Sequence, residues 1–289
     1  MMVFSGGDAI REFLAEFDGW LSESVDIYLL GDSAMTIHGL KDQTEDIDIA
    51  LAVDTEFEHV CQVLRTQDFD ITAEPTASFE NVGTTIELYH PRRDVRIDLF
   101  DRQIVGKVLV SDRMCDRAEV FWSGTHANAF VLADEDMFLL KAVSGGDLAS
   151  GRRRDIKDMR TYAQRGLDYD TILDEIKYQR PFNMGTTEAR QLREGSHPLF
   201  TIEAAVTSLT GLPQQFTDRI TALGTEFEVE HMIVDAIDEG SSDIETIRGQ
   251  VLADVRALSA EDDEMVDAAV ERLVRKRVLD SDDGAIRQR

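Results

Sequence analysis

The sequence predicts an α+β fold, in which a mixed sheet with flanking helices is followed by a helical, winged-helix-like C-terminal domain. Up to about residue 133, short strand-like segments alternate with helical ones, and beyond that point the periodicity is almost wholly helical. The periodicity breaks at RPFNMGTT (180–187). We therefore predict two domains, residues 1–183 and 184–289, in keeping with the chain length of 289 residues.

Periodicity also defines the elements of the first domain. Residues 8–21 carry apolar side chains at helical spacing, DIYLL (26–30) is typical of a buried strand, and IDIALAV (47–53) alternates as a strand does. TTIELYH and VRIDLF, joined by the turn PRRD, predict a hairpin over 84–100. Other strands are predicted over 104–110, 118–122 and 127–131, and other helices over 33–39, 55–66 (with a capping box from Thr55 and Glu58), 134–144, 152–165 and 169–179.

The C-terminal part has the element order of a winged helix. Three helices are predicted over 226–238, 243–257 and 262–277, followed by a hairpin over 278–287 that turns at Asp283-Gly284. A basic cluster lies in the last helix: Arg272, Arg275, Lys276 and Arg277. Residues 201–289 nevertheless hold 20 acidic and 9 basic residues, a net charge of -11, whereas a DNA-binding face is normally basic. We therefore favour a protein partner or a homodimer through this domain over DNA binding.

Composition excludes several classes of protein. The formal net charge is -27, and only 6 of the 30 basic residues are Lys, a balance that suggests a halophilic host whose salt screens the self-repulsion. Two cysteines form no disulfide framework, and the N-terminus does not resemble a signal peptide. No stretch is long and apolar enough for a membrane span. We expect a cytoplasmic protein with no membrane association.

The main chemical feature is a set of aspartates on predicted strands. Asp-x-Asp occurs five times in this acidic chain, so the pair alone carries little information. Asp46 and Asp48, however, alternate with Ile47 and Ile49 on a strand, which places both carboxylates on one face. Asp98 alternates with apolar neighbours in a later strand. Three carboxylates facing one side favour bound Mg²⁺ or Mn²⁺, which prefer oxygen ligands.

The turn at Gly31 suits the same chemistry. It follows a strand and opens a short helix. Glycine allows close approach of the backbone to a phosphate, and a helix N-terminus offers free N–H groups. A metal site beside an anion cradle is what a nucleoside triphosphate with its Mg²⁺ requires.

These motifs resemble a known superfamily. LLGDSAMTIHGLKDQTEDIDIA, with the later IDLF, is similar to the DNA polymerase-β-like nucleotidyltransferases, and more narrowly to the abortive-infection nucleotidyltransferases, toxins of type IV toxin–antitoxin systems, and their uncharacterised haloarchaeal-type relatives. The residues that match the motif of this narrower family are Gly31, Ala34, Gly39, Lys41, Thr44, Asp46 and Asp48. A helix carrying a Lys, followed by an Arg-Asp pair, appears within residues 133–159. The resemblance covers roughly residues 25–180.

The resemblance implies a function and roles for individual residues. Asp46 and Asp48 would hold the metals that bind the triphosphate, and Asp98 would share the catalytic metal and help to activate an acceptor hydroxyl. Phosphate contacts would come from Gly31, Ser33, Lys141 and Arg154, with Asp155 or Asp158 in support. The product would be a nucleotide attached to RNA such as tRNA, to a protein or to a small molecule, with pyrophosphate released.

Other interpretations of these residues remain open at this point. Asp32 stands where the family has Gly or Ser, and its carboxylate repels a phosphate. Either Ser33 takes over the contact, or the substrate has changed, or the site is inactive. Lys141 could pack along its helix, Arg154 could pair with Asp158, and His38 is expected to pack rather than to catalyse. The alternative function is a catalytically weakened scaffold that acts as a DNA- or protein-binding regulator through its tail.

Overall fold

The computed structural model describes residues 2–73, 85–104, 108–145, 153–179, 198–238, 240–241, 243–254, 263–275, 279–282 and 285–288. The chain divides into two compact units. Unit 1 is Met1–Lys141 with Lys157–Asp168, and unit 2 is Ala142–Ile156 with Tyr169–Arg289. The predicted boundary at residue 183, the predicted loop over 145–151 and the predicted turn at Asp283-Gly284 lie wholly or almost wholly outside the described residues.

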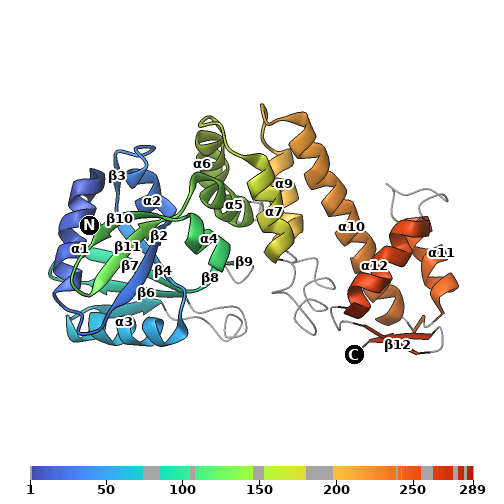
Figure 1. Ribbon diagram of the computed structural model, residues 1–289, viewed down its shortest axis with the longest axis horizontal. Coiled ribbons are helices and arrows are strands. Elements are labelled where there is room, and N and C mark those ends of the chain that lie inside the picture. The colour runs from blue at the N-terminus through green and yellow to red at the C-terminus, as the bar shows by residue number, and fades with distance from the viewer. Residues whose placement is uncertain are drawn as a thin grey trace. The chain divides into compact units, whose positions relative to one another are not determined.

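Unit 1 is organised around a seven-stranded mixed sheet (Figure 1). Its strands, in spatial order, are β10 (Glu119–Ser123), β11 (Ala127–Val131), β2 (Val25–Leu30), β4 (Asp46–Leu51), β7 (Val95–Asp101), β6 (Thr85–His90) and β5 (Asp70–Ala73). The β11–β2 and β4–β7 pairs are parallel and the others antiparallel. Two small ribbons accompany the sheet, β1 (Phe4–Ser5) with β3 (Gln43–Thr44) and β8 (Gln103–Ile104) with β9 (Val108–Leu109).

One face of this sheet is the core of unit 1. Alternate residues of β2, β4 and β7 point into it, and they are fully or almost fully buried. The amphipathic helices α1 (Gly6–Asp18) and α3 (Asp54–Thr66) cover this face with residues such as Phe13, Phe17 and Leu64. The alternation leaves Asp46, Asp48 and Asp98 on the opposite face. Unit 1 also contains two short helices, α2 (Gly31–Ile37) and α4 (Asp112–Arg117). Two further helices, α5 (Asp134–Gly145) and α6 (Arg153–Ala163), contribute residues to both units.

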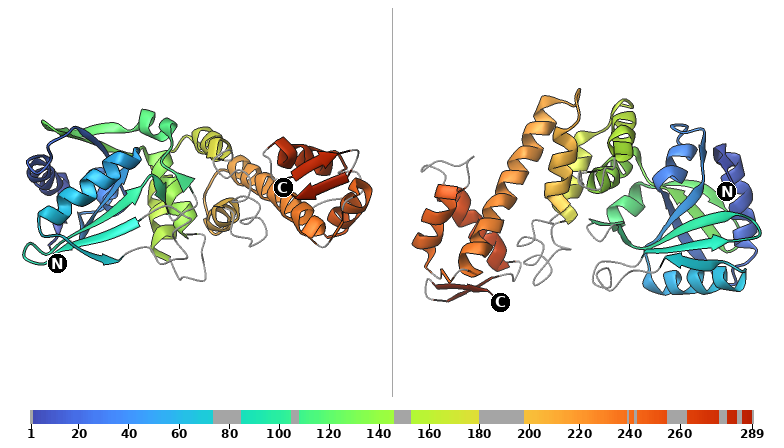
Figure 2. Two further views of the ribbon diagram at one scale, coloured as in Figure 1. Left: turned by 90° about the horizontal axis from the view of Figure 1, so that it is seen from below. Right: turned by 180° about the vertical axis from the view of Figure 1, so that it is seen from behind.

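Unit 2 is helical and ends in a hairpin (Figure 2). Its further elements are α7 (Tyr169–Gln179), α9 (Pro198–Thr207), α10 (Gln214–Asp238), α11 (Ile244–Asp254), α12 (Asp263–Arg275), β12 (Leu279–Asp282) and β13 (Ala285–Gln288). The strands β12 and β13 pair antiparallel. Arg272 of α12 pairs with the fully buried Glu230 of α10 at 2.7 Å, so one member of the basic cluster holds two helices together.

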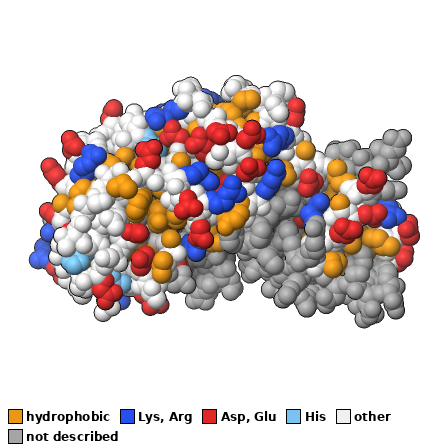
Figure 3. All heavy atoms as spheres, viewed as in Figure 1, with side chains coloured by type: hydrophobic (Ala, Val, Ile, Leu, Met, Phe, Trp, Pro, Cys, Tyr) orange, Lys and Arg blue, Asp and Glu red, His pale blue; other side chains and the backbone are white. Residues whose placement is uncertain are grey.

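The α+β fold with a helical C-terminal part is confirmed, whereas some local predictions are wrong. The predicted capping box fails, because α3 begins after Val53 and has no side-chain cap. α10 begins at Gln214, twelve residues before the predicted start. Acidic side chains are spread over the face drawn in Figure 3, with basic ones among them. Within the described part of the chain, none of the helices combines the length and apolar character of a membrane span.

Candidate active site

The turn from β2 into α2 brings backbone against a carboxylate. Gly31 has a φ of +57°, a left-handed conformation that favours glycine. A Cβ at Gly31 would lie 2.1 Å from Oδ2 of Asp48, so no larger residue fits without a shift of that carboxylate. The Asp32 N–H, next in the chain, donates to the same Oδ2 at 3.1 Å. The first turn of α2 is thereby held on the strand β4.

Strand register places the predicted carboxylates together. Asp48 of β4 lies opposite Asp98 of β7, and Asp98 lies opposite Glu87 of β6. Asp46, two residues before Asp48, shares their face, and its Oδ1 accepts a hydrogen bond of 3.0 Å from Thr44. Four acidic side chains from three adjacent strands therefore lie on the face of the sheet opposite α1 and α3.

Two carboxyl groups of this face, those of Asp48 and Asp98, have raised pKa values. Burial, reinforced by repulsion from Asp46 and Asp98, raises the pKa of Asp48 well above its usual value. Burial, followed by repulsion from Asp46 and Glu87, raises the pKa of Asp98 to about 6. The Lys141 ammonium opposes the shift at Asp48, and Arg96 opposes it at Asp98. A divalent cation would relieve both the repulsion and the desolvation.

The chemistry of these residues fits Mg²⁺ or Mn²⁺. Asp46, Asp48 and Asp98 offer only oxygen ligands, and Oδ1 of Asp98 is a buried atom with no hydrogen-bond partner among the described residues. Among the described residues no three His, Cys, Asp or Glu side chains already surround one point. The carboxylates therefore share a face and a register rather than a preformed metal cage.

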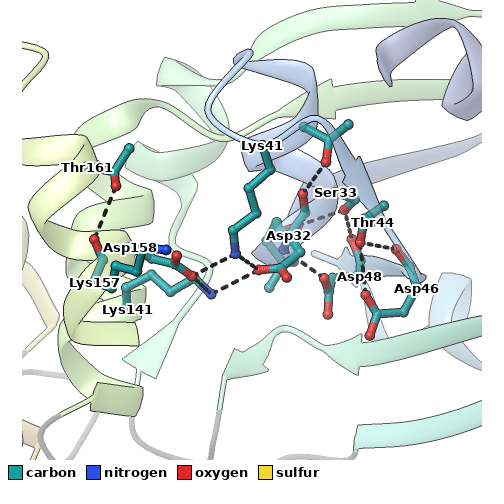
Figure 4. Close-up of polar contacts among 12 residues, drawn as sticks. Asp32, Ser33, Lys41, Thr44, Asp46, Asp48, Lys141, Lys157, Asp158 and Thr161 are labelled. Carbon is teal, nitrogen blue, oxygen red and sulfur yellow. Dashed lines mark hydrogen bonds and ion pairs between the residues drawn. The ribbon is translucent and has the colours of Figure 1, made fainter. Parts of the chain in front are cut away.

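A second cluster adjoins the carboxylates (Figure 4). Lys41, in the loop after α2, donates to Oδ1 of Asp32 at 2.6 Å and to Oδ2 of Asp158 at 2.9 Å. Lys141 of α5 lies 3.4 Å and 3.0 Å from the same two oxygens. We call these four residues, all within unit 1, the Lys–Asp quartet. The two lysines of the quartet offset the negative charge of Asp32, whose carboxylate would otherwise repel a phosphate.

The structure shows no phosphate-facing position for two predicted contacts, Ser33 and Arg154. Ser33 is fully buried, and its hydroxyl donates to the Leu30 carbonyl at 2.7 Å, so the hydroxyl hydrogen is already engaged. Arg154 lies on α6 in unit 2 with an exposed side chain, and the structure does not place it relative to the carboxylates of unit 1. His38 packs edge-on against Tyr162 and pairs with Asp134 at 2.8 Å, in keeping with a packing role.

Sequence reasoning did not identify Glu87 as part of the site, nor the contact between Lys41 and Asp158. Glu87 alternates with apolar residues in IELYH, the signal that identified Asp98, and hairpin pairing would have placed the two opposite each other. In the sequence, Lys41 is distinguished only by its place in the motif that resembles the family. Its partner Asp158 lies 117 residues away, and no local pattern reports a contact over such a separation.

No family model matches this chain, and no curated protein gives a significant match. Among solved structures, the chain is similar to one described as the crystal structure of an antigenic nucleotidyltransferase-like protein from Paracoccidioides brasiliensis. The sequence identity is 17% and the TM-score 0.36, and the match covers 63% of this chain and 93% of that one. At this similarity no residue's role passes from that protein to this chain.

Proposed function

We propose that this chain is a metal-dependent nucleotidyltransferase, which moves a nucleotide from a nucleoside triphosphate to a hydroxyl acceptor. The observation that carries the proposal is the register of β4 and β7, which sets Asp48 opposite Asp98 with Asp46 on the same face. Such a concentration of half-buried carboxylates is costly unless cations bind there. The resemblance of the Gly31 turn and the Asp46-Ile47-Asp48 strand to polymerase-β-like enzymes points the same way.

In this proposal each carboxylate has a role. Asp46 and Asp48 would hold the Mg²⁺ or Mn²⁺ that accompanies the triphosphate, and Asp98 would hold the cation at the acceptor. When bound, the cations would neutralise charge on the attacking and leaving oxygens. Asp98 would also take the proton of the acceptor hydroxyl. That oxygen bonds to the α-phosphorus, the bond to the bridging oxygen breaks, and pyrophosphate leaves with the electron pair.

The acceptor is proposed only as a class. RNA, with tRNA tested first, a protein or a small hydroxyl compound would each provide the required oxygen. A toxin–antitoxin role belongs to this proposal through the resemblance alone, and a protein partner or homodimer would use the C-terminal helices. The host is proposed to be halophilic, since the chain carries a net charge of -27.

Transfer activity after single substitutions tests the proposal. Labelled nucleoside triphosphates, Mg²⁺ or Mn²⁺ and candidate acceptors are incubated with wild type, Asp46→Asn and Asp98→Asn. We expect about a 100-fold or greater loss in each variant without loss of folding. Asp70→Asn is the matched control, because Asp70 belongs to another Asp-x-Asp pair and is an exposed residue of the same sheet. Full activity in both site variants would refute the assignment.

A second function is favoured by the element order of unit 2. The helices α10, α11 and α12 are followed by the β12–β13 hairpin, the order of a winged helix. Arg272 of the basic cluster is occupied by Glu230, which favours a protein partner over nucleic acid. The corresponding proposal is a regulator that binds through unit 2. Specific binding of a partner or duplex that persists in an Asp46→Asn/Asp98→Asn variant would support it.

A further inference from the structure

We infer that Lys41 and Lys141 together form a binding site for a polyphosphate chain, and that Asp32 and Asp158 are the counter-ions that this chain displaces. The triphosphate of a nucleotide is the natural ligand only if the proposed function holds. The binding of polyphosphate by two ammonium groups stands apart from catalysis. Asp32 then weakens the binding of polyphosphate without preventing it.

The geometry of the Lys–Asp quartet carries the first step. Both ammonium groups contact the same two oxygens, Oδ1 of Asp32 and Oδ2 of Asp158, at 2.6 to 3.4 Å. Two cations that share two anionic oxygens lie close enough to share other anionic oxygens. A chain of linked phosphates presents such oxygens in series, and ammonium groups bind phosphate as point charges.

Exposure decides which members an incoming anion meets. The side chains of Lys41 and Lys141 are 20% and 12% exposed, whereas those of Asp32 and Asp158 are 11% and 4% exposed. Lys41 is therefore the most accessible member, and Asp158 is the least accessible. The quartet has no net charge, and a buried ammonium group without a counter-ion is costly, so the aspartates stabilise the site when no ligand is bound. A polyphosphate can replace them because it brings more negative charge than they do.

The position of the quartet selects a chain of phosphates rather than one phosphate. Asp32 belongs to both clusters, since its carboxylate meets the lysines and its N–H donates to Asp48. In Figure 4 the lysines lie on one side of Asp32, and Asp46 and Asp48 lie on the other. Under the proposed function, a ligand that spans the two sides would bind the lysines at one end and the cations held by the carboxylates at the other. An extended phosphate chain meets that requirement.

Calorimetric titration with sodium tripolyphosphate, without divalent cations or nucleotide, tests this inference. The full-length chain is studied at the lowest KCl concentration that keeps it folded, because salt screens ionic binding. We expect Asp32→Asn to bind tripolyphosphate at least about tenfold more tightly than wild type, because it removes the competing charge. Lys41→Met and Lys141→Met should each bind at least about tenfold more weakly.

Two further variants keep the result interpretable. Asp134→Asn is the matched control: it removes one charge from a side chain that is 18% exposed and pairs with His38 and Arg165, outside the quartet. It should bind as wild type does. If Asp32→Asn does not fold, Asp158→Asn takes its place with the same expected gain.

The outcomes separate this inference from the proposed function. Tighter binding in the aspartate variants and weaker binding in both lysine variants support it, even if no transfer activity is found. A folded Asp32→Asn protein that binds no more tightly than wild type overturns it, as does unchanged binding by Lys41→Met. Loss of transfer in Asp46→Asn leaves either result standing, because tripolyphosphate is titrated without metal.

Discussion

Asp48 and Asp98 lie directly opposite each other where β4 and β7 run parallel. Like charges at one register position destabilise a sheet, and here both groups are half-buried. The same strands bury Ile47, Ile49 and Ile97 on the other face, and that burial stabilises the pairing. The stability of the core therefore holds two carboxylates at a separation that they would not adopt alone.

The first prediction concerns pH and Asp98. Because the pKa of Asp98 is about 6 in the folded chain against an ordinary 3.8, the folded state binds more protons between these values. The free energy of unfolding of the metal-free protein should therefore rise as pH falls from 7.5 to 5. Asp98→Asn should be more stable than wild type by up to about 3 kcal/mol at pH 7.5 and by about half of that at pH 5. Urea unfolding in a chelator at several pH values measures this, and a constant difference would contradict it.

The second prediction concerns divalent cations. Mg²⁺ or Mn²⁺ should raise the unfolding temperature of wild type, because binding to the folded state alone adds about 2.7 kcal/mol at a hundredfold excess over Kd. An Asp48→Asn/Asp98→Asn variant should lose most of this increase. Asp68→Asn/Asp70→Asn is the control for cations that collect on the acidic surface, and KCl keeps ionic strength constant. Equal increases in all three proteins would argue against a specific site.

The third prediction separates crowding from backbone strain at Gly31. Gly31→Ala should cost about 3 kcal/mol or more, because its Cβ would meet the Asp48 carboxylate while φ stays positive. Gly39→Ala is the control: its φ is +72° with nothing within 4 Å of the added Cβ, so about 1 kcal/mol of strain is expected. Chemical denaturation of both variants gives the comparison. Similar losses would mean that the contact with Asp48 is easily relieved.

The fourth prediction concerns the ion pair between α10 and α12. Arg272→Met should destabilise the chain by about 3 kcal/mol, because it leaves the buried Glu230 carboxylate without this partner. Arg272→Met/Glu230→Met should recover most of the loss. Arg248→Met, which breaks the pairs with Glu245 and Asp267 near the surface, should cost less than about 1 kcal/mol. Thermal unfolding ranks the variants, and a double variant as unstable as the single one would contradict the prediction.

Alternation in the sequence sufficed for most of the sheet and for the carboxylate face. Polar and apolar residues alternate over 46–49 of β4 and over 95–99 of β7, so the side on which Asp46, Asp48 and Asp98 lie could be predicted before any pairing was known. The pairing of β4 with β7 could not be predicted, since 43 residues separate the two strands and nothing local encodes their neighbourhood. The capping box at Thr55 failed because a four-residue pattern is common by chance and the chain enters α3 earlier. The Lys–Asp quartet could not be predicted, because its charged residues come from three separate segments of the chain.

Strand β4 has only two possible phases, and they are not equivalent. In one, isoleucines fill the core and aspartates face outward. A slip by one residue would bury the aspartates under α1 and α3 and expose the isoleucines. Deletion of a single residue within β4 should therefore abolish both the fold and the chemistry. Deletion of two residues would keep the alternation of core-facing and outward-facing positions. In β4, one alternation of residue types therefore specifies both the hydrophobic core and the charged face.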